Sequence, residues 1–213
     1  QGVDDEAVGE CVASIHHVPR RSIFLQQTFA HLNQLHSSLV CETRGEFGEG
    51  DRDDWAVHIA LWQRSAGSHG ELTDAAVALP GLGLTLSTSP APQPPARQER
   101  TPLMVVSRSR TPAVAAAVAQ ELGFDGVRLG SAGAKTMAVV LGNVDVYLHA
   151  GGQYQWDSAA PIAVARAAGL HTSRIDGSPL VYNERDTWLP DLLVCQPHLA
   201  DDILQAVRNF TRN

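Results

Sequence analysis

A single carboxylate stands out in the segment GGQYQWDSAAP, residues 151–161. Asp157 follows Trp156 and precedes small residues and Pro161, a pattern that predicts the first turn of a helix. Such an aspartate can cap the helix by accepting hydrogen bonds from backbone N–H groups. It can also be a ligand for Mg²⁺, which prefers oxygen ligands and binds through one or two carboxylates together with substrate phosphate oxygens. The residues alone leave both interpretations open.

A second segment, RLGSAGAK at 128–135, contains residues suited to an anion. Gly130, Ser131 and Ala132 lie between a predicted strand and a predicted helix, whose first backbone N–H groups favour negative charge. The segment is not a Walker A loop, because its spacing differs and no Ser or Thr follows Lys135. A turn that merely allows close packing is an equal interpretation.

A third segment, VVSRSR at 105–110, places Ser107, Arg108 and Arg110 at the end of a predicted strand. Open α/β sheets bind ligands outside the carboxyl ends of their strands. Two arginines at that place suit a phosphate or a nucleotide, and a solvated turn is the alternative.

Other kinds of site are disfavoured. The nine histidines show no zinc-ligand spacing, and His58 lies inside a strand pattern that is typical of a core residue. The sequence has no G-x-S-x-G elbow, and no cysteine stands beside a base. The acidic run of Asp51, Asp53 and Asp54 is interpreted as a solvated loop.

The composition is that of an ordinary globular protein, with 213 residues, of which 44% are hydrophobic and 18% charged. The formal charge of −7 argues against a broad nucleic-acid surface, but it permits a small phosphorylated ligand, because a metal ion or a helix N-terminus can supply local positive charge. Three dispersed cysteines favour a reducing compartment, and we expect a cytoplasmic location. We find no membrane-spanning run and no signal peptide pattern.

The first half of the chain predicts a helix at 22–40, a charged glycine-rich loop at 41–54, and antiparallel strands at 55–63, 72–80 and 82–88. A proline-rich linker follows at 89–102.

Beyond the linker, strands and helices alternate, which indicates a layered α/β architecture. Thr111 is the predicted cap of the first of these helices, and Gly123 is its predicted end. The predicted strands are 103–109, 126–131, 144–150, 170–176 and 189–196, and the predicted helices are 111–123, 132–142, 157–169 and 197–210.

Taken together, the segments DDWAVHIALW, VVSRSR, GSAGAK, DVYLHAGGQYQWDSAAP and DGSPLVYN resemble the 3′(2′),5′-bisphosphate nucleotidases (CysQ type) of the inositol monophosphatase superfamily. W-D-x-A-A is the second signature of that superfamily, and its order after G-S-x-x-x-K and V-S-R-S strengthens the match. The resemblance covers about residues 44–213.

The resemblance implies an αβαβα layered fold and Mg²⁺-dependent removal of the 3′-phosphate of 3′-phosphoadenosine 5′-phosphate, a by-product of sulfate assimilation. An inositol or sugar monophosphatase is the alternative within the superfamily. No residue is assigned to the catalytic step. The implied site consists of Asp157 as metal ligand near the substrate, Gly130, Ser131 and Ala132 along the sugar or nucleoside, and Lys135, Ser107 and Arg108 near the nucleotide.

The first signature of the superfamily, D-P-L-D-G-T followed by R/K-E-F, is missing. The corresponding place reads SLVCETRGEF, in which only Thr43, Arg44, Glu46 and Phe47 match the tail of the signature. The third hypothesis is therefore a catalytically impaired fragment or pseudoenzyme. A reading-frame error or truncation upstream of about residue 44 would explain this departure and the first residue, Gln1 in place of Met.

We therefore predict an atypical segment at 1–43, the remainder of an N-terminal α+β subdomain at 44–88, the linker at 89–102, and a C-terminal α/β subdomain at 103–213. The expected partner is a small phosphorylated nucleotide or sugar. Neither nucleic acid nor a membrane is expected, and a homodimer is left open.

Overall fold

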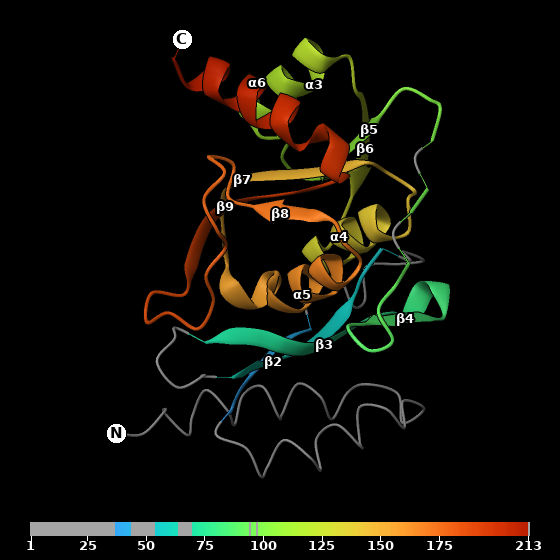
Figure 1. Cartoon of the computed structure of the whole chain (residues 1–213), viewed down its shortest axis with the longest axis vertical. Helices are drawn as coiled ribbons and strands as arrows, with labels where there is room; N and C mark the ends of the chain where they lie inside the picture. Colours follow the sequence, from blue (N-terminus) through green and yellow to red (C-terminus); the bar gives the residue numbers. More distant parts are fainter. Residues whose placement is uncertain (1–36, 44–53, 64–69, 94, 97, 213) are drawn as a thin grey trace.

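The computed structural model describes residues 37–43, 54–63, 70–93, 95–96 and 98–212 (Figure 1). A four-stranded antiparallel sheet comes first in the chain, with strand order β1-β2-β3-β4. Its strands match the three predicted strands and add a fourth. Their bounds are β1 Ser37–Thr43, β2 Val57–Gln63, β3 Glu71–Leu79 and β4 Leu84–Ser87.

The second sheet has five strands in the order β6-β5-β7-β9-β8. Strand β5 is parallel to both β6 and β7, so the carboxyl ends of these three strands point toward one side of the sheet. Strand β9 is antiparallel to β7 and β8. The bounds are β5 Leu103–Ser107, β6 Asp125–Leu129, β7 Val146–Tyr154, β8 His171–Ser173 and β9 Trp188–Cys195.

The helices that the structure describes form two layers (Figure 1). Helices α4 (Ala132–Val140) and α5 (Ala159–Ala167) lie between the two sheets and share one hydrophobic core with both of them. Helices α3 (Ala113–Leu122) and α6 (Ala200–Arg212) cover the other face of the second sheet and form a second core with it. Short 3₁₀ turns at Pro80–Leu82, Gln155–Asp157 and Pro197–Leu199 complete the described elements.

This β-α-β-α arrangement confirms the predicted layered fold, since it contains four layers of the αβαβα order. The first helical layer of the predicted order would have to come from residues outside the described ranges. Residues 22–36 of the predicted helix 22–40 also lie outside them. The rest of that helix prediction is wrong, because residues 37–40 belong to β1 and pair with β2. The linker residues that the structure describes form neither helix nor strand. The division into subdomains stays a prediction.

Two details of the helix and strand ends correct the sequence reasoning. Pro112, and not Thr111, is the N-cap of α3, and no side chain caps that helix. Gly123 ends the helix in the left-handed conformation, with φ of 68°, as predicted. Strand β7 extends to Tyr154, beyond the predicted end at residue 150, because Gly151 and Gly152 accommodate a register shift at positive φ. This extension places the W-D segment directly at the end of β7.

Within the residues that the structure describes, no helix combines the length and apolar character that crossing a bilayer requires.

Candidate active site

Asp157 ends the 3₁₀ turn that links β7 to α5. Its Oδ2 accepts a hydrogen bond of 2.8 Å from the backbone N–H of Tyr154. The N-cap of α5 is Ser158, which makes no side-chain cap bond. The interpretation of Asp157 as the cap of the following helix is therefore wrong, because its carboxylate folds back on the preceding turn.

The second carboxylate oxygen of Asp157 is available to a cation. The side chain is buried, with 6% of the residue exposed, and Oδ1 has no hydrogen-bond partner. A buried carboxylate oxygen that lacks a partner is costly unless something binds it. One oxygen ligand of this kind fits a hard cation such as Mg²⁺. The described part of the chain offers no cluster of three His, Cys, Asp or Glu side chains to complete such a site.

Gln155 and Ser158, which lie on either side of Asp157 in the chain, both form hydrogen bonds with the segment 182–186. The side-chain oxygen of Gln155 accepts a hydrogen bond of 2.6 Å from the backbone of Asn183. Its amide nitrogen donates one of 2.9 Å to the carbonyl of Asp186. The buried hydroxyl of Ser158 lies 3.0 Å from the phenol oxygen of Tyr182. These bonds hold the carboxylate on a rigid support.

The GSAGAK segment forms the N-terminus of α4, where Ser131 caps the helix by accepting a 3.3 Å hydrogen bond from the N–H of Ala134. Lys135 is buried, and its Nζ donates a hydrogen bond of 2.6 Å to the carbonyl of Gly130. The same ammonium lies 5.3 Å from the centre of the Tyr147 ring, within range of a cation–π interaction. Ser131 and Ala132 are partly exposed, so their backbone can meet a ligand.

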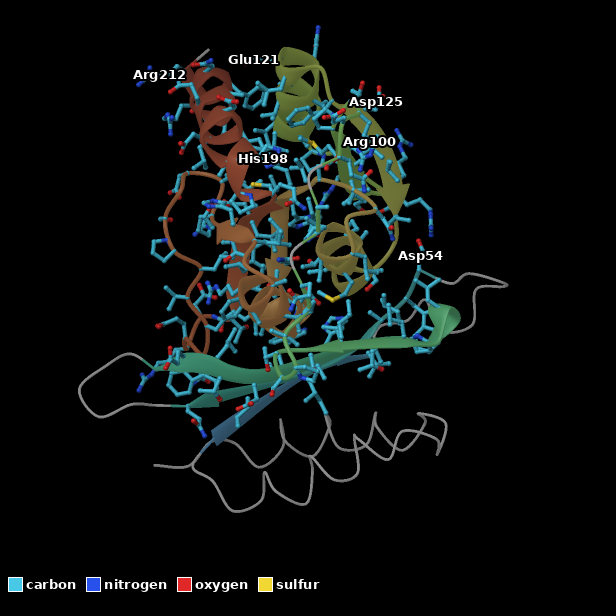
Figure 2. The ribbon with its side chains drawn as sticks, turned by 45° about the vertical axis from the view of Figure 1, so that its right-hand side comes forward. Asp54, Arg100, Glu121, Asp125, His198 and Arg212 are labelled. Carbon is cyan, nitrogen blue, oxygen red and sulfur yellow. The ribbon has the colours of Figure 1, made fainter. Side chains whose placement is uncertain are left out.

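Asp54 connects the first sheet to the carboxyl ends of β5 and β6. Its Oδ2 accepts hydrogen bonds from the guanidinium of Arg108 and, at 2.5 Å, from the N–H of Gly130. Figure 2 shows Asp54 on the side of the molecule where the first sheet approaches β6. Burial raises the pKa of Asp54, but the Gly130 N–H and Arg108 outweigh it and lower that pKa overall. The interpretation of Asp54 as part of a solvated loop is therefore wrong, and Arg108 is paired to it.

The backbone of Gly130 connects Asp54 to Lys135, because its N–H donates to the Asp54 carboxylate and its carbonyl accepts from the Lys135 ammonium. Ser107 lies at the neighbouring end of β5, and its hydroxyl is 3.1 Å from that of Ser109. Asp51 and Asp53, the other members of the acidic run, lie outside the described residues.

His149, which sequence reasoning did not consider, lies near Asp157. It lies on β7, and its Nε2 is 3.1 Å from the carbonyl of Gly152. Burial lowers the pKa of His149, and the positive charges of Lys135 and Arg110 lower it further, against the effects of Gly152 and Asp157. His149 thus lies within electrostatic reach of Asp157 and of two cations. In the sequence it is only the fourth residue of the strand β7, and a histidine in a strand does not by itself indicate a site.

Gly151 and Gly152, the two glycines at the register shift of β7, each lie against a different side chain. A Cβ at Gly151 would lie 3.3 Å from Nη2 of Arg110. A Cβ at Gly152 would lie 1.7 Å from Cζ2 of Trp188, so the indole packs directly on this backbone. A side chain at position 152 would displace the indole, whereas one at position 151 would require only a small shift of the arginine.

Three exposed aromatic residues, which we call the aromatic cluster, adjoin Asp157. The rings of Tyr154 and Trp156 stack with centres 4.5 Å apart and planes 8° apart. Trp188 meets the Tyr154 ring edge to face at 5.5 Å. Their exposed fractions of 40%, 38% and 48% are large for aromatic side chains that contact one another. Exposed aromatic groups of this kind are typical of binding surfaces.

Comparison with known proteins tests the resemblance. The model of the inositol monophosphatase family matches residues 78–212. The 3′-phosphoadenosine 5′-phosphate phosphatase of Mycobacterium tuberculosis is 52% identical over 170 residues, which cover 78% of this chain and 64% of that protein. The 3′(2′),5′-bisphosphate nucleotidase CysQ of Escherichia coli K12 is 37% identical over 93 residues, covering 44% of this chain and 38% of that protein. The chain thus spans less than two thirds of the length of these relatives.

Solved structures agree on the fold. An inositol monophosphatase from Zymomonas mobilis superposes with a TM-score of 0.66 at 16% identity, covering 86% of this chain and 80% of that one. Inositol monophosphatase II from Staphylococcus aureus gives 0.65 at 14%, covering 83% and 71%. At these identities the structural likeness shows the fold alone. The family is shown by the family model, which matches well over half of the chain. The chain belongs to the inositol monophosphatase family.

Proposed function

We propose that this chain comes from a Mg²⁺-dependent phosphomonoesterase that removes the 3′-phosphate of 3′-phosphoadenosine 5′-phosphate. The observation that carries the proposal is the buried Oδ1 of Asp157, which has no hydrogen-bond partner. His149, which lies in the field of Asp157, also lies in the fields of Lys135 and Arg110. The names of the relatives that are 52% and 37% identical support the choice of substrate.

Enzymes of this family are metal-dependent phosphatases. Asp157 would be one ligand of the ion, which when bound polarises a phosphoryl oxygen and lowers the pKa of a bound water. The remaining roles belong to the chain's own residues. Arg110 supplies a positive charge for the phosphate groups, and the N–H groups that begin α4 favour an anion at Ser131 and Ala132.

We propose indirect roles for Arg108 and Lys135, two of the predicted substrate-binding residues. Arg108 binds Asp54, and we propose that it fixes Gly130 through this carboxylate instead of contacting the substrate directly. Lys135 is bound to the carbonyl of Gly130, so its charge acts on the site from within the protein. His149 remains neutral at neutral pH because burial lowers its pKa, and a neutral imidazole can still donate one N–H.

The aromatic cluster favours a nucleotide over an inositol phosphate. Nucleobases stack on exposed aromatic rings with a gain of about 1–3 kcal/mol per base, whereas a polyol ring offers no π face. Trp188 packs on Gly152, next to the glycine beside which Arg110 lies. The same edge therefore offers both a cation for a phosphate and a ring for a base.

A catalytically impaired chain is the second candidate. D-P-L-D-G-T is absent from the sequence, and the described residues contain no three-residue metal cluster. A phosphatase that clamps both the attacking and the leaving oxygen needs more carboxylates than Asp157 alone. A cytoplasmic location and a homodimer stay predictions.

Release of inorganic phosphate by the purified, folded chain tests the proposal. With Mg²⁺ we expect turnover of 3′-phosphoadenosine 5′-phosphate to exceed that of inositol 1-phosphate and fructose 1,6-bisphosphate, and we expect Li⁺ to inhibit it. Preference for one of the other two substrates would assign the inositol or sugar phosphatase activity. A folded chain that releases no phosphate from any of them would identify the impaired form.

A further inference from the structure

The side chain of Gln155 is buried, with 7% of the residue exposed, although both of its neighbours in the chain belong to the aromatic cluster. Its amide oxygen accepts hydrogen bonds from the backbone N–H groups of Asn183, at 2.6 Å, and Glu184, at 3.3 Å. Its amide nitrogen donates one of 2.9 Å to the carbonyl of Asp186. One side chain thus holds three backbone groups of the segment 183–187.

These three bonds require an acceptor and a donor on the same side chain. The amide of glutamine supplies both, whereas a carboxylate only accepts and an ammonium only donates. The segment 183–187 has neither helix nor strand, and most of it is exposed. Its first residue, Asn183, has a φ of 65°, which is uncommon for a residue other than glycine. Such a conformation persists where the surrounding structure fixes it, and the Gln155 oxygen binds the N–H of this residue.

The segment leads directly into Trp188. The carbonyl of Asp186 accepts from the Gln155 amide, and Oδ1 of the same aspartate accepts a hydrogen bond of 3.0 Å from the N–H of Trp188. The backbone N–H of Gln155 donates a bond of 2.8 Å to the carbonyl of Thr187. Gln155 therefore holds both residues that precede Trp188, whose indole packs on Gly152.

The turn that carries Asp157 has supports that do not involve the Gln155 side chain. Oδ2 of Asp157 accepts from the N–H of Tyr154, and the N–H of Ser158 donates to the backbone carbonyl of Gln155 at 3.2 Å. Both bonds persist when the amide is replaced. The amide therefore acts on the segment 183–187 and on Trp188, and the candidate metal ligand keeps its place without it.

We propose that Gln155 is a positioning residue for Trp188: its amide holds the segment 183–187 so that the indole stays on Gly152, beside the turn that carries Asp157. The ring then has a fixed place relative to the carboxylate, as a ligand with a phosphate at one end and a base at the other requires. This inference rests on the proposed function, in which the base of the nucleotide stacks on the aromatic cluster. A phosphate ester without a base does not depend on this placement.

The experiment compares the full wild-type chain with Gln155→Met and Gln155→Glu. Methionine keeps the length of the side chain and removes the amide, whereas glutamate keeps the acceptors and loses the donor. Val118→Ala is the control for a general loss of stability, because it removes buried volume from the core on the other face of the second sheet. Near-UV circular dichroism reports the packing of aromatic rings, and the difference between wild type and Trp188→Ala isolates the contribution of Trp188. KM and kcat are measured with Mg²⁺ for 3′-phosphoadenosine 5′-phosphate and for inositol 1-phosphate.

We expect Gln155→Met to lose most of the Trp188 contribution to the dichroism. It should raise KM for 3′-phosphoadenosine 5′-phosphate about 5-fold or more, the smallest loss expected when one base no longer stacks. The kcat for this substrate and both constants for inositol 1-phosphate should change little. Gln155→Glu should show a smaller change of the same kind, and Val118→Ala should lower the melting temperature without either effect.

A Trp188 contribution that persists in Gln155→Met, or an equal rise of KM for both substrates, would overturn the inference. Failure of the proposed function gives a different result. If the wild-type chain releases no phosphate, or prefers inositol 1-phosphate, the proposed function fails on that observation, and the dichroism alone decides whether Gln155 positions Trp188.

Discussion

Gly133 of α4 and His58 of β2 occupy adjoining space, since a Cβ at position 133 would lie 2.5 Å from Nε2 of the imidazole and 2.9 Å from Cβ of Ala56. Real atoms do not approach so closely, so either the helix or the strand would have to move. The close approach of α4 to the first sheet therefore depends on the absence of a side chain at this position.

Replacement of this glycine should destabilise the protein. Alanine is favoured over glycine inside a helix by about 1 kcal/mol, but overpacking a filled core costs about 1–3 kcal/mol. Both close contacts involve buried residues, His58 of β2 and Ala56 directly before it, so we expect Gly133→Ala to lower the free energy of unfolding overall. Gly126→Ala is the control, because a Cβ there meets nothing within 4 Å. Denaturant melts that show equal stability for both variants would contradict the packing argument.

Asp157→Asn separates a metal ligand from a structural acceptor. The amide oxygen can still accept the hydrogen bond from the Tyr154 N–H, so we expect the melting temperature to change little. The loss of the negative charge should abolish most Mg²⁺ affinity and phosphate release, because hard cations prefer carboxylate oxygens. Asp202→Asn, at an exposed position of α6, should leave the Mg²⁺ affinity and the phosphate release unchanged. Full Mg²⁺ affinity in Asp157→Asn would rule out the ligand role.

The two partners in the Asp54–Arg108 pair should differ in their contribution to stability. The Arg108 side chain is 39% exposed, and exposed ion pairs contribute about 0–1 kcal/mol. Asp54→Ala also removes the acceptor of the Gly130 N–H, and an unsatisfied donor costs about 1–3 kcal/mol. We therefore expect Asp54→Ala to destabilise the chain more than Arg108→Ala in urea denaturation. An equal loss in both variants would show that the ion pair alone matters.

Trp188 should affect the choice of substrate. If a base stacks on the aromatic cluster, Trp188→Ala should reduce kcat/KM for 3′-phosphoadenosine 5′-phosphate about 5- to 150-fold, corresponding to about 1–3 kcal/mol of stacking. Turnover of inositol 1-phosphate should be little affected. Phe210→Ala, at an exposed aromatic residue of α6, is the control. Equal losses on both substrates would instead assign Trp188 to the support of the Gly152 backbone.

The regular elements were predictable from local patterns because each is decided by its own residues. Strands β2, β3 and β5 have the apolar runs that a buried strand requires. Gly123 ends α3 because the left-handed conformation suits glycine. The helix prediction is wrong for residues 37–40, because these residues pair with β2 despite the helical spacing of the apolar residues before them.

The site was only partly predictable, because its geometry depends on contacts between distant segments. W-D-x-A-A identified Asp157, but the hydrogen bonds that hold its turn come from residues 182–186. Asp54 looked like one charge in an acidic loop, and only the fold brings it to Gly130, far along the chain. His149 has no local signal, because the charges that act on it come from segments that the fold brings around it.

The burial of Cys195 should make the stability of the protein depend on pH in the alkaline range. The thiol is fully buried, and burial raises its pKa from 9.0 to about 12. Because the folded pKa lies above the unfolded one, the neutral thiol adds stability that is complete below pH 9 and is lost as the pH rises from about 9 toward 12. Melting temperatures of the wild type should therefore fall more steeply between pH 8.5 and about 10.5 than those of Cys195→Ala.

Iodoacetamide at pH 8 should leave Cys195 unmodified in the folded chain and modify it in denaturant, as read by mass spectrometry. Rapid modification in the folded chain would mean that β9 opens far more readily than its packing between β7 and β8 allows.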